Sequence, residues 1–240
     1  MQTIIARLRK FANWLLPHIC VSCHLNCDIN TKSDLCPVCI QYLPWMNSYC
    51  YRCGAGLVTQ QESLVCKRCL DNPPPFNRLC VLFAYQQPII KLINQLKFGQ
   101  KLFVGKIFGQ LLATAVKYNW YKHNDLPQLI IPVPLHQKRQ RQRGYNQAVE
   151  IATTVAKQLH IPLGINMCIR VINTKPQALL DKEQRYLNVK NAFIANIPPI
   201  YKHVVIIDDV CTTGNTLRNL SRALILNGVE TIDVWCIARA

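Results

Sequence analysis

From residue 79 onward, short apolar runs alternate with longer segments in which apolar residues recur at helical spacing. The apolar runs have the length of β-strands and cover residues 80–85, 129–134, 204–207 and 231–237. The helical spacing covers residues 89–96, 102–118, 145–159 and 217–227. The run from Val204 to Ile207 is β-branched throughout, which predicts a strand buried on both faces. Strands and helices that alternate in this way predict an α/β fold with a mostly parallel sheet flanked by helices.

The first 75 residues have a different pattern. Apolar residues follow helical spacing over residues 4–16, which predicts an amphipathic helix that packs on the protein's own core, with a membrane-surface helix as the alternative. Three consecutive prolines, residues 73–75, predict a stiff linker. We therefore expect a small N-terminal domain over residues 1–75 and the α/β domain over residues 79–240.

Eight of the thirteen cysteines form four C-x-x-C pairs in the first domain. In two repeats that are thirty residues apart, they are Cys20, Cys23, Cys36 and Cys39, then Cys50, Cys53, Cys66 and Cys69. Two thiolates on a tight turn can bind one tetrahedral Zn²⁺, and a second pair completes four sulfur ligands. The repetition argues against a redox pair, and it predicts two structural zinc ions. We expect one zinc per repeat, with cross-braced pairing as the alternative, and Cys27, His18 and His24 as bystanders.

The composition adds an excess of positive charge. The chain has 28 Lys and Arg against 12 Asp and Glu, a formal net charge of +16, which two sites of four thiolates and one Zn²⁺ would lower to about +12. Between residues 72 and 149, eleven basic residues face a single acid, Asp125. Such an excess calls for an anionic partner, either nucleic acid or a phosphorylated metabolite. Candidate pyrophosphate-binding or DNA-binding residues are Lys138, Arg139, Arg141, Arg143 and Tyr145.

Aromatic residues near this basic segment are candidates for stacking on the bases of single-stranded nucleic acid. Tyr145 is the best of them because it follows a glycine in a polar segment, whereas Phe98 and Phe103 are expected in the core. No apolar run is long enough to cross a bilayer. Basic residues also interrupt the place where a signal peptide would begin its apolar region. We therefore expect a soluble, cytoplasmic protein.

The strand predicted at Val204–Ile207 runs directly into two acids, Asp208 and Asp209, and then into the segment TTGNT, residues 212–216. Ligands of parallel sheets bind at the carboxyl ends of the strands. Backbone N–H groups of such a segment, with a helix N-terminus behind them, suit a phosphate dianion. The acids can accept hydrogen bonds from sugar hydroxyls or hold Mg²⁺. A sugar phosphate fits both parts, and the missing G-K-[ST] excludes a Walker loop.

This block resembles the phosphoribosyl-pyrophosphate (PRPP) motif of type I phosphoribosyltransferases. Two further segments, PVPLH from Pro132 to His136 and RGYNQ from Arg143 to Gln147, are similar to the PVPLH…RGFNQ segments of the ComF competence family. A third pattern of that family, T-x-x-Q-x-x-L…R-x-x-N…AF, is matched between Thr174 and Phe193. Longer ComF members also carry an N-terminal double zinc ribbon. The resemblance implies a type I phosphoribosyltransferase fold preceded by a small zinc-ribbon domain.

The resemblance also implies a role in natural transformation, in handling incoming single-stranded DNA. PRPP or another sugar phosphate, together with Mg²⁺, would be its ligand. Asp208 and Asp209 would hold the ribose hydroxyls, and the 5′-phosphate would be bound by Thr212, Thr213, Gly214, Asn215 and Thr216. The competence DNA-translocation ATPase is a further partner that the resemblance suggests. Two alternatives stay open, an active phosphoribosyltransferase on a nucleobase or amine and a PRPP-responsive regulator without catalysis.

Overall fold

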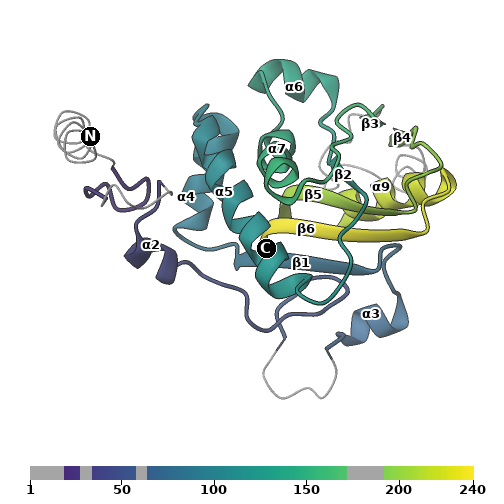
Figure 1. The fold of residues 1–240 in the computed structure, drawn as a ribbon, viewed down its shortest axis with the longest axis horizontal. Coiled ribbons are helices and arrows are strands. Elements are labelled where there is room, and N and C mark those ends of the chain that lie inside the picture. Colours follow the sequence, from purple (N-terminus) through teal and green to yellow (C-terminus); the bar gives the residue numbers. More distant parts are fainter. Residues whose placement is uncertain (1–18, 28–33, 58–63, 172–191) are drawn as a thin grey trace, which may run out of the picture. The chain divides into compact units, whose positions relative to one another are not determined.

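The computed structural model describes residues 19–27, 34–57, 64–171 and 192–240, coloured along the chain in Figure 1. The chain divides into two compact units, Met1–Pro44 and Trp45–Ala240, and each is described by itself. The helix predicted over residues 4–16 lies outside the described residues, as does the ComF-like pattern from Thr174 to Asn188. Among the residues described, no helix is long and apolar enough to cross a membrane.

The first unit is built around two C-x-x-C turns, which we call knuckles. An isolated bridge between Ile19 and Asn26 closes the first knuckle. The second knuckle opens helix α2 (Pro37–Gln41), where the Cys36 sulfur accepts a hydrogen bond from the Cys39 N–H. Proline suits the first helical position because its missing N–H would have no partner there. Each knuckle is therefore shaped by local backbone hydrogen bonds.

The second unit contains a four-stranded sheet in the order β1-β6-β5-β2, with every neighbouring pair parallel. The strands are β1 (Arg78–Ala84), β2 (Leu129–Pro132), β5 (His203–Cys211) and β6 (Thr231–Arg239). Positions 204–207 of β5 are fully buried, as the β-branched run predicted. The parallel sheet of the predicted α/β fold is thus confirmed, and its carboxyl ends share one edge.

Helices cover both faces of this sheet (Figure 1). They are α4 (Ile89–Phe98), α5 (Leu102–Ala115) with a π-helical turn η1 (Val116–Trp120), α7 (Gln147–Leu159) and α9 (Asn215–Leu226). Helix α7 packs on β2 and β5, and α5 packs on α7 and β6. On the other face, Leu217 and Leu220 of α9 share a core cluster with Val204 and Ile206 of β5. Alternate residues of each strand therefore point into two separate cores.

Close packing of α5 on α7 depends on a glycine. A Cβ on Gly109 would lie 2.5 Å from the Thr154 Cβ and 2.8 Å from the Ile151 carbonyl oxygen. Because real Cβ atoms do not approach so closely, the helices can touch here only through a residue without a side chain. Gly109 thus fixes the distance between the two helices that cover β2, β5 and β6.

Several short elements were not predicted. Strands β3 (Cys168–Arg170) and β4 (Phe193–Ala195) form a separate antiparallel pair, helix α3 (Lys67–Asp71) follows Cys66, and helix α6 (Gln137–Arg143) contains the candidate basic residues. Helix α6 contains only Gln, Lys and Arg, which are good helix formers because their unbranched side chains lose little rotamer freedom. Its sequence QKRQRQR has no apolar stripe, and periodicity alone therefore could not reveal it.

A buried polar network lies near the amino ends of β1, β5 and β6. Asp233 Oδ2 accepts hydrogen bonds from the Tyr121 hydroxyl at 2.5 Å and pairs with His203 Nε2 at 3.0 Å and Arg78 Nε at 3.3 Å. Burial alone would raise the pKa of Asp233, but hydrogen bonds from His203 and Tyr121 and the charge of Arg78 outweigh it, so the pKa is lowered. The network therefore holds an ionised carboxylate inside the domain.

Candidate functional site

The eight paired cysteines form two clusters among the residues that the structure describes, Cys20/Cys23/Cys36/Cys39 and Cys50/Cys53/Cys66/Cys69. Within each cluster the sulfur atoms all lie within 4.8 Å of one another. The Cys53 and Cys66 sulfurs are 3.7 Å apart, and the Cys23 and Cys36 sulfurs are 4.0 Å apart. Four sulfurs around one zinc, at Zn–S of about 2.3 Å, would be about 3.8 Å apart. The clusters fit tetrahedral metal sites, and their pairing is sequential.

Backbone N–H groups point at the sulfurs in the same way in both repeats. The Cys36 N–H donates to Cys20 Sγ at 3.4 Å, and the Cys66 N–H donates to Cys50 Sγ at 3.3 Å. Burial opposes ionisation, but N–H donors lower the pKa of Cys20 to about 6 and the pKa of Cys50 to about 7. In each cluster these N–H donors thus favour the thiolate of one cysteine, which is the form that binds a metal.

The second cluster belongs to the same compact unit as the sheet. Gly54, with φ +70°, follows its first knuckle, and a Cβ on Gly54 would lie 2.5 Å from Cδ2 of Leu79. The Leu79 N–H also donates to the Tyr51 carbonyl at 3.0 Å. This knuckle therefore lies directly on β1. The domain boundary expected between residues 75 and 79 stays a prediction.

The expected bystanders lie outside both clusters where they are described. Cys27 is buried and His24 is exposed in a left-handed turn with φ +61°, and neither is grouped with the four sulfurs of the first cluster. His18 lies outside the described residues. The grouping of the eight cysteines could be predicted because their spacing along the chain is local.

The acidic pair lies on β5, which continues beyond the predicted run as far as Cys211. Asp208 Oδ1 accepts from the Asp209 N–H at 2.9 Å, and Asp209 Oδ2 pairs with Lys97 Nζ at 2.7 Å. Burial and the charge of Asp209 raise the pKa of Asp208 well above its ordinary value, although Lys97 opposes them. Two adjacent carboxyl groups with one lysine leave negative charge that a cation or hydroxyl donors would stabilise.

The predicted phosphate-binding residues, which we call the threonine segment (residues 212–216), connect β5 to α9. Thr212 and Thr213 are exposed, and Gly214 adopts a left-handed conformation with φ +76° as the residue that precedes the helix. Helix α9 begins at Asn215, so Asn215 and Thr216 lie in its first turn rather than in the loop. Gly214 provides no capping side chain, although the Asn215 N–H lies 3.4 Å from the Thr213 hydroxyl oxygen. The N–H groups of the first turn point out of the helix N-terminus, as an anion site requires.

The basic residues of α6 are partly tied to neighbouring helices. Arg143 donates through its guanidinium to Gln147 Oε1 at 2.9 Å, and its Cζ lies 5.2 Å from the centre of the Phe98 ring. The Tyr145 hydroxyl donates to the Leu96 carbonyl of α4. Lys138, Arg139 and Arg141 belong to the same helix, with Arg139 half-buried and the other two exposed. The predicted basic residues are therefore brought together on a helix beside the end of α4.

Two aromatic residues that were expected in the core are exposed instead. Phe98 is 71% exposed and Phe103 is 43% exposed. They flank the turn between α4 and α5, since Phe98 is the last residue of α4 and Phe103 is the second residue of α5. Phe98 and not Tyr145 is thus the more accessible ring, because Tyr145 is half-buried and its hydroxyl is engaged.

Sequence reasoning missed Lys97 as the partner of Asp209, and it missed Arg170 of β3 altogether. Burial and the charge of Arg139 lower the pKa of Arg170, and the charge of Asp208 opposes them. Arg170 is therefore within electrostatic reach of both the acidic pair and α6. A strand of three residues, of which only Cys168 is buried, carries no periodic signal that could have pointed to it.

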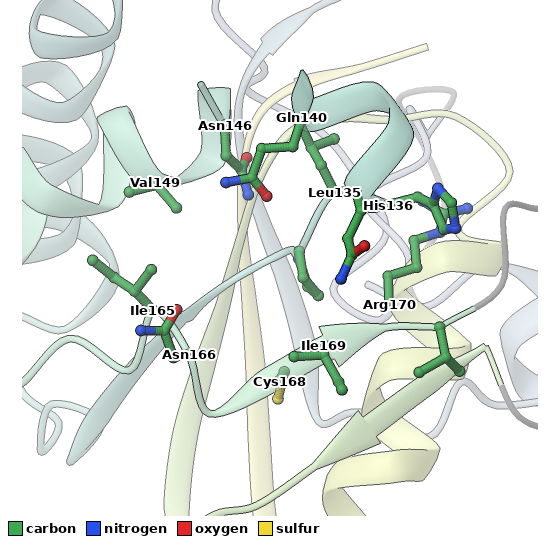
Figure 2. A pocket seen from close by; sticks show the side chains of 13 residues that line it. Leu135, His136, Gln140, Asn146, Val149, Ile165, Asn166, Cys168, Ile169 and Arg170 are labelled. Carbon is green, nitrogen blue, oxygen red and sulfur yellow. The ribbon is translucent and has the colours of Figure 1, made fainter. Parts of the chain in front are cut away.

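A pocket of about 400 Å³ opens between α6, the start of α7 and β3 (Figure 2). Gln140 and Asn146 lie on one side of it, and Ile169 and Arg170 lie on the other. Val149 and Ile165 add apolar surface. Amide, imidazole and guanidinium groups share the lining with these apolar side chains, and such polar groups fix the orientation of a bound small molecule. The pocket therefore places β3 and the basic helix around one space.

Comparisons with known proteins match two parts of the chain. Residues 11–70 match the model of the double zinc ribbon domain, and residues 146–240 match the model of the phosphoribosyl transferase domain. A solved purine phosphoribosyltransferase from Pyrococcus horikoshii aligns with 55% of this chain and 80% of that chain at 17% identity, with a TM-score of 0.34. The family models and the parallel sheet together show the phosphoribosyltransferase fold class.

Relatives match over nearly the whole chain. Competence protein F of Haemophilus influenzae is 36% identical over 225 residues, covering 92% of this chain and 96% of the relative. The DNA utilization protein YhgH of Shigella flexneri is 33% identical, covering 93% and 98%. Competence protein ComFC of Bacillus subtilis is 26% identical over 211 residues, covering 88% and 79%.

Proposed function

Because the chain belongs to the ComF family of competence proteins, we propose that it acts in natural transformation by handling incoming single-stranded DNA. Its relatives are named for competence and for DNA utilization. The observation that carries the proposal is the exposed ring of Phe98 beneath the Arg143 guanidinium at the end of the basic helix. Aromatic rings beside arginines are what proteins use to bind single strands, since every base has a face for stacking.

The DNA would run along a surface that we call the α6 surface, composed of Phe98, Lys138, Arg139, Arg141 and Arg143. Basic residues of α6 would neutralise backbone phosphates while Phe98 stacks on one base. The Tyr145 hydroxyl bond to the Leu96 carbonyl supports this arrangement, because it fastens the end of α6 to the end of α4. The ring and the charges are therefore held on neighbouring helices before DNA arrives.

The threonine segment would bind a sugar phosphate such as PRPP. Its exposed hydroxyls and the N-terminus of α9 supply donors for the 5′-phosphate. Asp208 and Asp209 would hold ribose hydroxyls or Mg²⁺, which prefers carboxylate oxygens. The ion, when bound, would add positive charge beside the pyrophosphate group. Lys97 supplies one positive charge beside two carboxyl groups, which leaves negative charge for that ion.

A second candidate is an active phosphoribosyltransferase that joins PRPP to a nucleobase or amine. The pocket between α6 and β3 favours it, because its amides and apolar walls suit a planar heterocycle close to Arg170. In this reaction the bond between ribose C1 and pyrophosphate breaks as the acceptor nitrogen bonds to C1. Release of pyrophosphate with a panel of acceptors, abolished by Asp208→Asn, would support it. No release with any acceptor would leave the binding function alone.

The DNA proposal is tested by fluorescence anisotropy with a labelled single strand and Phe98→Ala. Loss of a stacking ring should weaken binding by about 1–3 kcal/mol. The matched control is Tyr118→Ala, because Tyr118 is 60% exposed and also lies beneath a cation, Lys117, at 5.4 Å. Binding that is unchanged by Phe98→Ala, or weakened equally by both variants, would contradict the α6 surface as the DNA site.

A further inference from the structure

The side chain of Arg239, the last residue of β6, reaches both the second metal cluster and the threonine segment. Its Nε donates to the carbonyl of Cys53 at 3.2 Å. One guanidinium nitrogen donates to the carbonyl of Cys211 at 3.0 Å and also to the carbonyls of Thr212 and Ala240. A metal ligand and the entrance to the threonine segment are therefore joined through one guanidinium group.

The cysteine end of this connection is held by the cluster itself. Cys53 is buried, and the Gly54 N–H donates to the Cys50 carbonyl at 2.8 Å. A Cβ on Gly54 would lie 3.7 Å from the Arg239 Cδ, so the knuckle packs against the arginine stem. A metal that holds the sulfurs of Cys50 and Cys53 therefore also fixes the peptide that accepts from Arg239.

The other end of the connection determines where backbone N–H groups point. In a trans peptide the carbonyl and the N–H point in opposite directions. Because the carbonyls of Cys211 and Thr212 face Arg239, the N–H groups of Thr212 and Thr213 must point away from it. Donors directed in this way are available to an anion on the far side of the segment. The Ala240 N–H also donates to the Cys211 carbonyl at 3.0 Å, so Arg239 has its main effect at the Thr212 carbonyl and hence on the Thr213 N–H. Arg239 thus aligns the donors without touching the anion.

We propose that Arg239 is a positioning residue that couples the second metal cluster to the threonine segment. Metal in that cluster holds the Cys53 carbonyl, this carbonyl holds the guanidinium, and the guanidinium holds the two peptides in the orientation that binds phosphate. Loss of the metal releases the first of these contacts and lets the peptides turn. The proposal rests on the proposed function in so far as the segment binds phosphate.

Hydrogen exchange of the full-length protein tests the coupling without any ligand. Arg239→Gln should speed exchange of the amides at 212–217 roughly tenfold, the effect of losing one hydrogen bond from a charged donor. Cys66→Ser, which removes a ligand of the second cluster, should do the same. The double variant should add little to either single change, since both break one chain of contacts. Metal content and exchange of the α7 peptide are measured alongside.

The control is Arg222→Gln, because Arg222 is exposed on α9 and donates within that helix, to Asn219 Oδ1 at 3.4 Å. It should leave exchange at 212–217 unchanged. If Cys66→Ser disturbs α7 as well, the Arg239 variant alone decides the result. Unchanged exchange at 212–217 in Arg239→Gln would overturn the proposal, and so would effects of the two variants that simply add.

Calorimetric titration with Mg²⁺ and PRPP gives the functional arm of the test. Arg239→Gln should weaken PRPP binding roughly tenfold while zinc content stays unchanged. Arg239→Lys should recover part of the affinity, because an ammonium can reach one of the carbonyls but lacks the planar fork. If the wild-type chain does not bind PRPP, the proposed phosphate site is wrong. The exchange data still decide whether metal and segment are coupled.

Discussion

Nζ of Lys97 lies 2.7 Å from Oδ2 of Asp209, so that the last turn of α4 delivers a cation to the acidic pair on β5. The lysine acts on the neighbouring residue as well. Burial and Asp209 raise the pKa of Asp208, and the positive charge of Lys97 lowers it. Lys97 therefore helps to keep Asp208 ionised, which matters because only the carboxylate can accept hydroxyl donors or bind Mg²⁺.

Binding of PRPP with Mg²⁺ should depend on the ionisation of Asp208. The pKa of Asp208 is raised above the ordinary value of about 3.9. The affinity for PRPP should therefore begin to fall at a higher pH than the titration of an ordinary aspartate would cause. Lys97→Gln should move this fall to higher pH. Calorimetry at several pH values measures it, with the exposed Lys91 of the same helix changed to Gln as the control. A midpoint that Lys97→Gln does not move would contradict this role.

The buried network at Asp233 should control stability in acid. Its pKa is lowered in the folded protein, so this carboxylate stabilises the fold fully above its unfolded value of about 3.9, and the stabilisation is lost as the pH falls further towards the folded pKa. Asp233→Asn leaves Arg78 without its charged partner inside the domain, and it should cost about 3–5 kcal/mol. Urea unfolding at neutral and acidic pH measures both effects.

The control for this stability measurement is Asp125→Asn, because Asp125 is exposed in the segment before β2. It should leave the free energy of unfolding within about 0.5 kcal/mol of wild type, as surface changes usually do. The Asp233→Asn variant should also lose part of the wild-type dependence on acidic pH. If Asp233→Asn is as stable as wild type at neutral pH, the network contributes nothing.

The two cysteine clusters should lose metal independently. The sulfurs group sequentially, with Cys20 in one cluster and Cys50 in the other. Cys20→Ser should therefore lower the zinc content from two ions per purified chain to one, since removing one thiolate ligand breaks only its own site. Mass spectrometry under native conditions counts the ions. Loss of both ions from the single variant would indicate cross-braced binding, and fewer than two in wild type would refute the two-site model.

Sequence patterns were informative where the determining contacts are local. The metal clusters follow from the spacing of C-x-x-C pairs, and β5 follows from four consecutive β-branched residues, because a strand buried on both faces has no polar alternation. The same reasoning placed the acidic pair and the threonine segment at the carboxyl edge of the sheet. It also found the main helices, whose apolar stripes face the two cores.

Other features depend on contacts that no local pattern records. Helix α6 has no apolar stripe, so its existence follows from propensity and from capping by His136, whose Nδ1 accepts from the Lys138 N–H at 3.2 Å. Phe98 was expected in the core because apolar side chains usually pack there, but it sits where α4 ends. Arg239 joins Cys53 to Cys211, residues far apart along the chain. Only the folded sheet brings such groups together.

Single-strand binding should weaken with salt in proportion to the number of phosphates that α6 neutralises. Each contact should contribute about 0.7 to the slope of log K against log[salt], because binding releases condensed counterions. Arg141→Gln, which removes an exposed charge and no stacking partner, should flatten the slope by about that amount. Arg143→Gln should flatten it similarly and also weaken binding at high salt, since Arg143 lies over the Phe98 ring.

Anisotropy titrations over a range of salt concentrations separate these two contributions, with Arg222→Gln on α9 as the control for a lost surface charge. The control should keep the wild-type slope, because Arg222 lies outside the α6 surface. Equal slopes in wild type and Arg141→Gln would mean that α6 does not neutralise the DNA backbone. At high salt the charge contribution is screened, and only contact with the base distinguishes the two variants. If Arg143→Gln and Arg141→Gln bind equally well at high salt, Arg143 has no role in stacking.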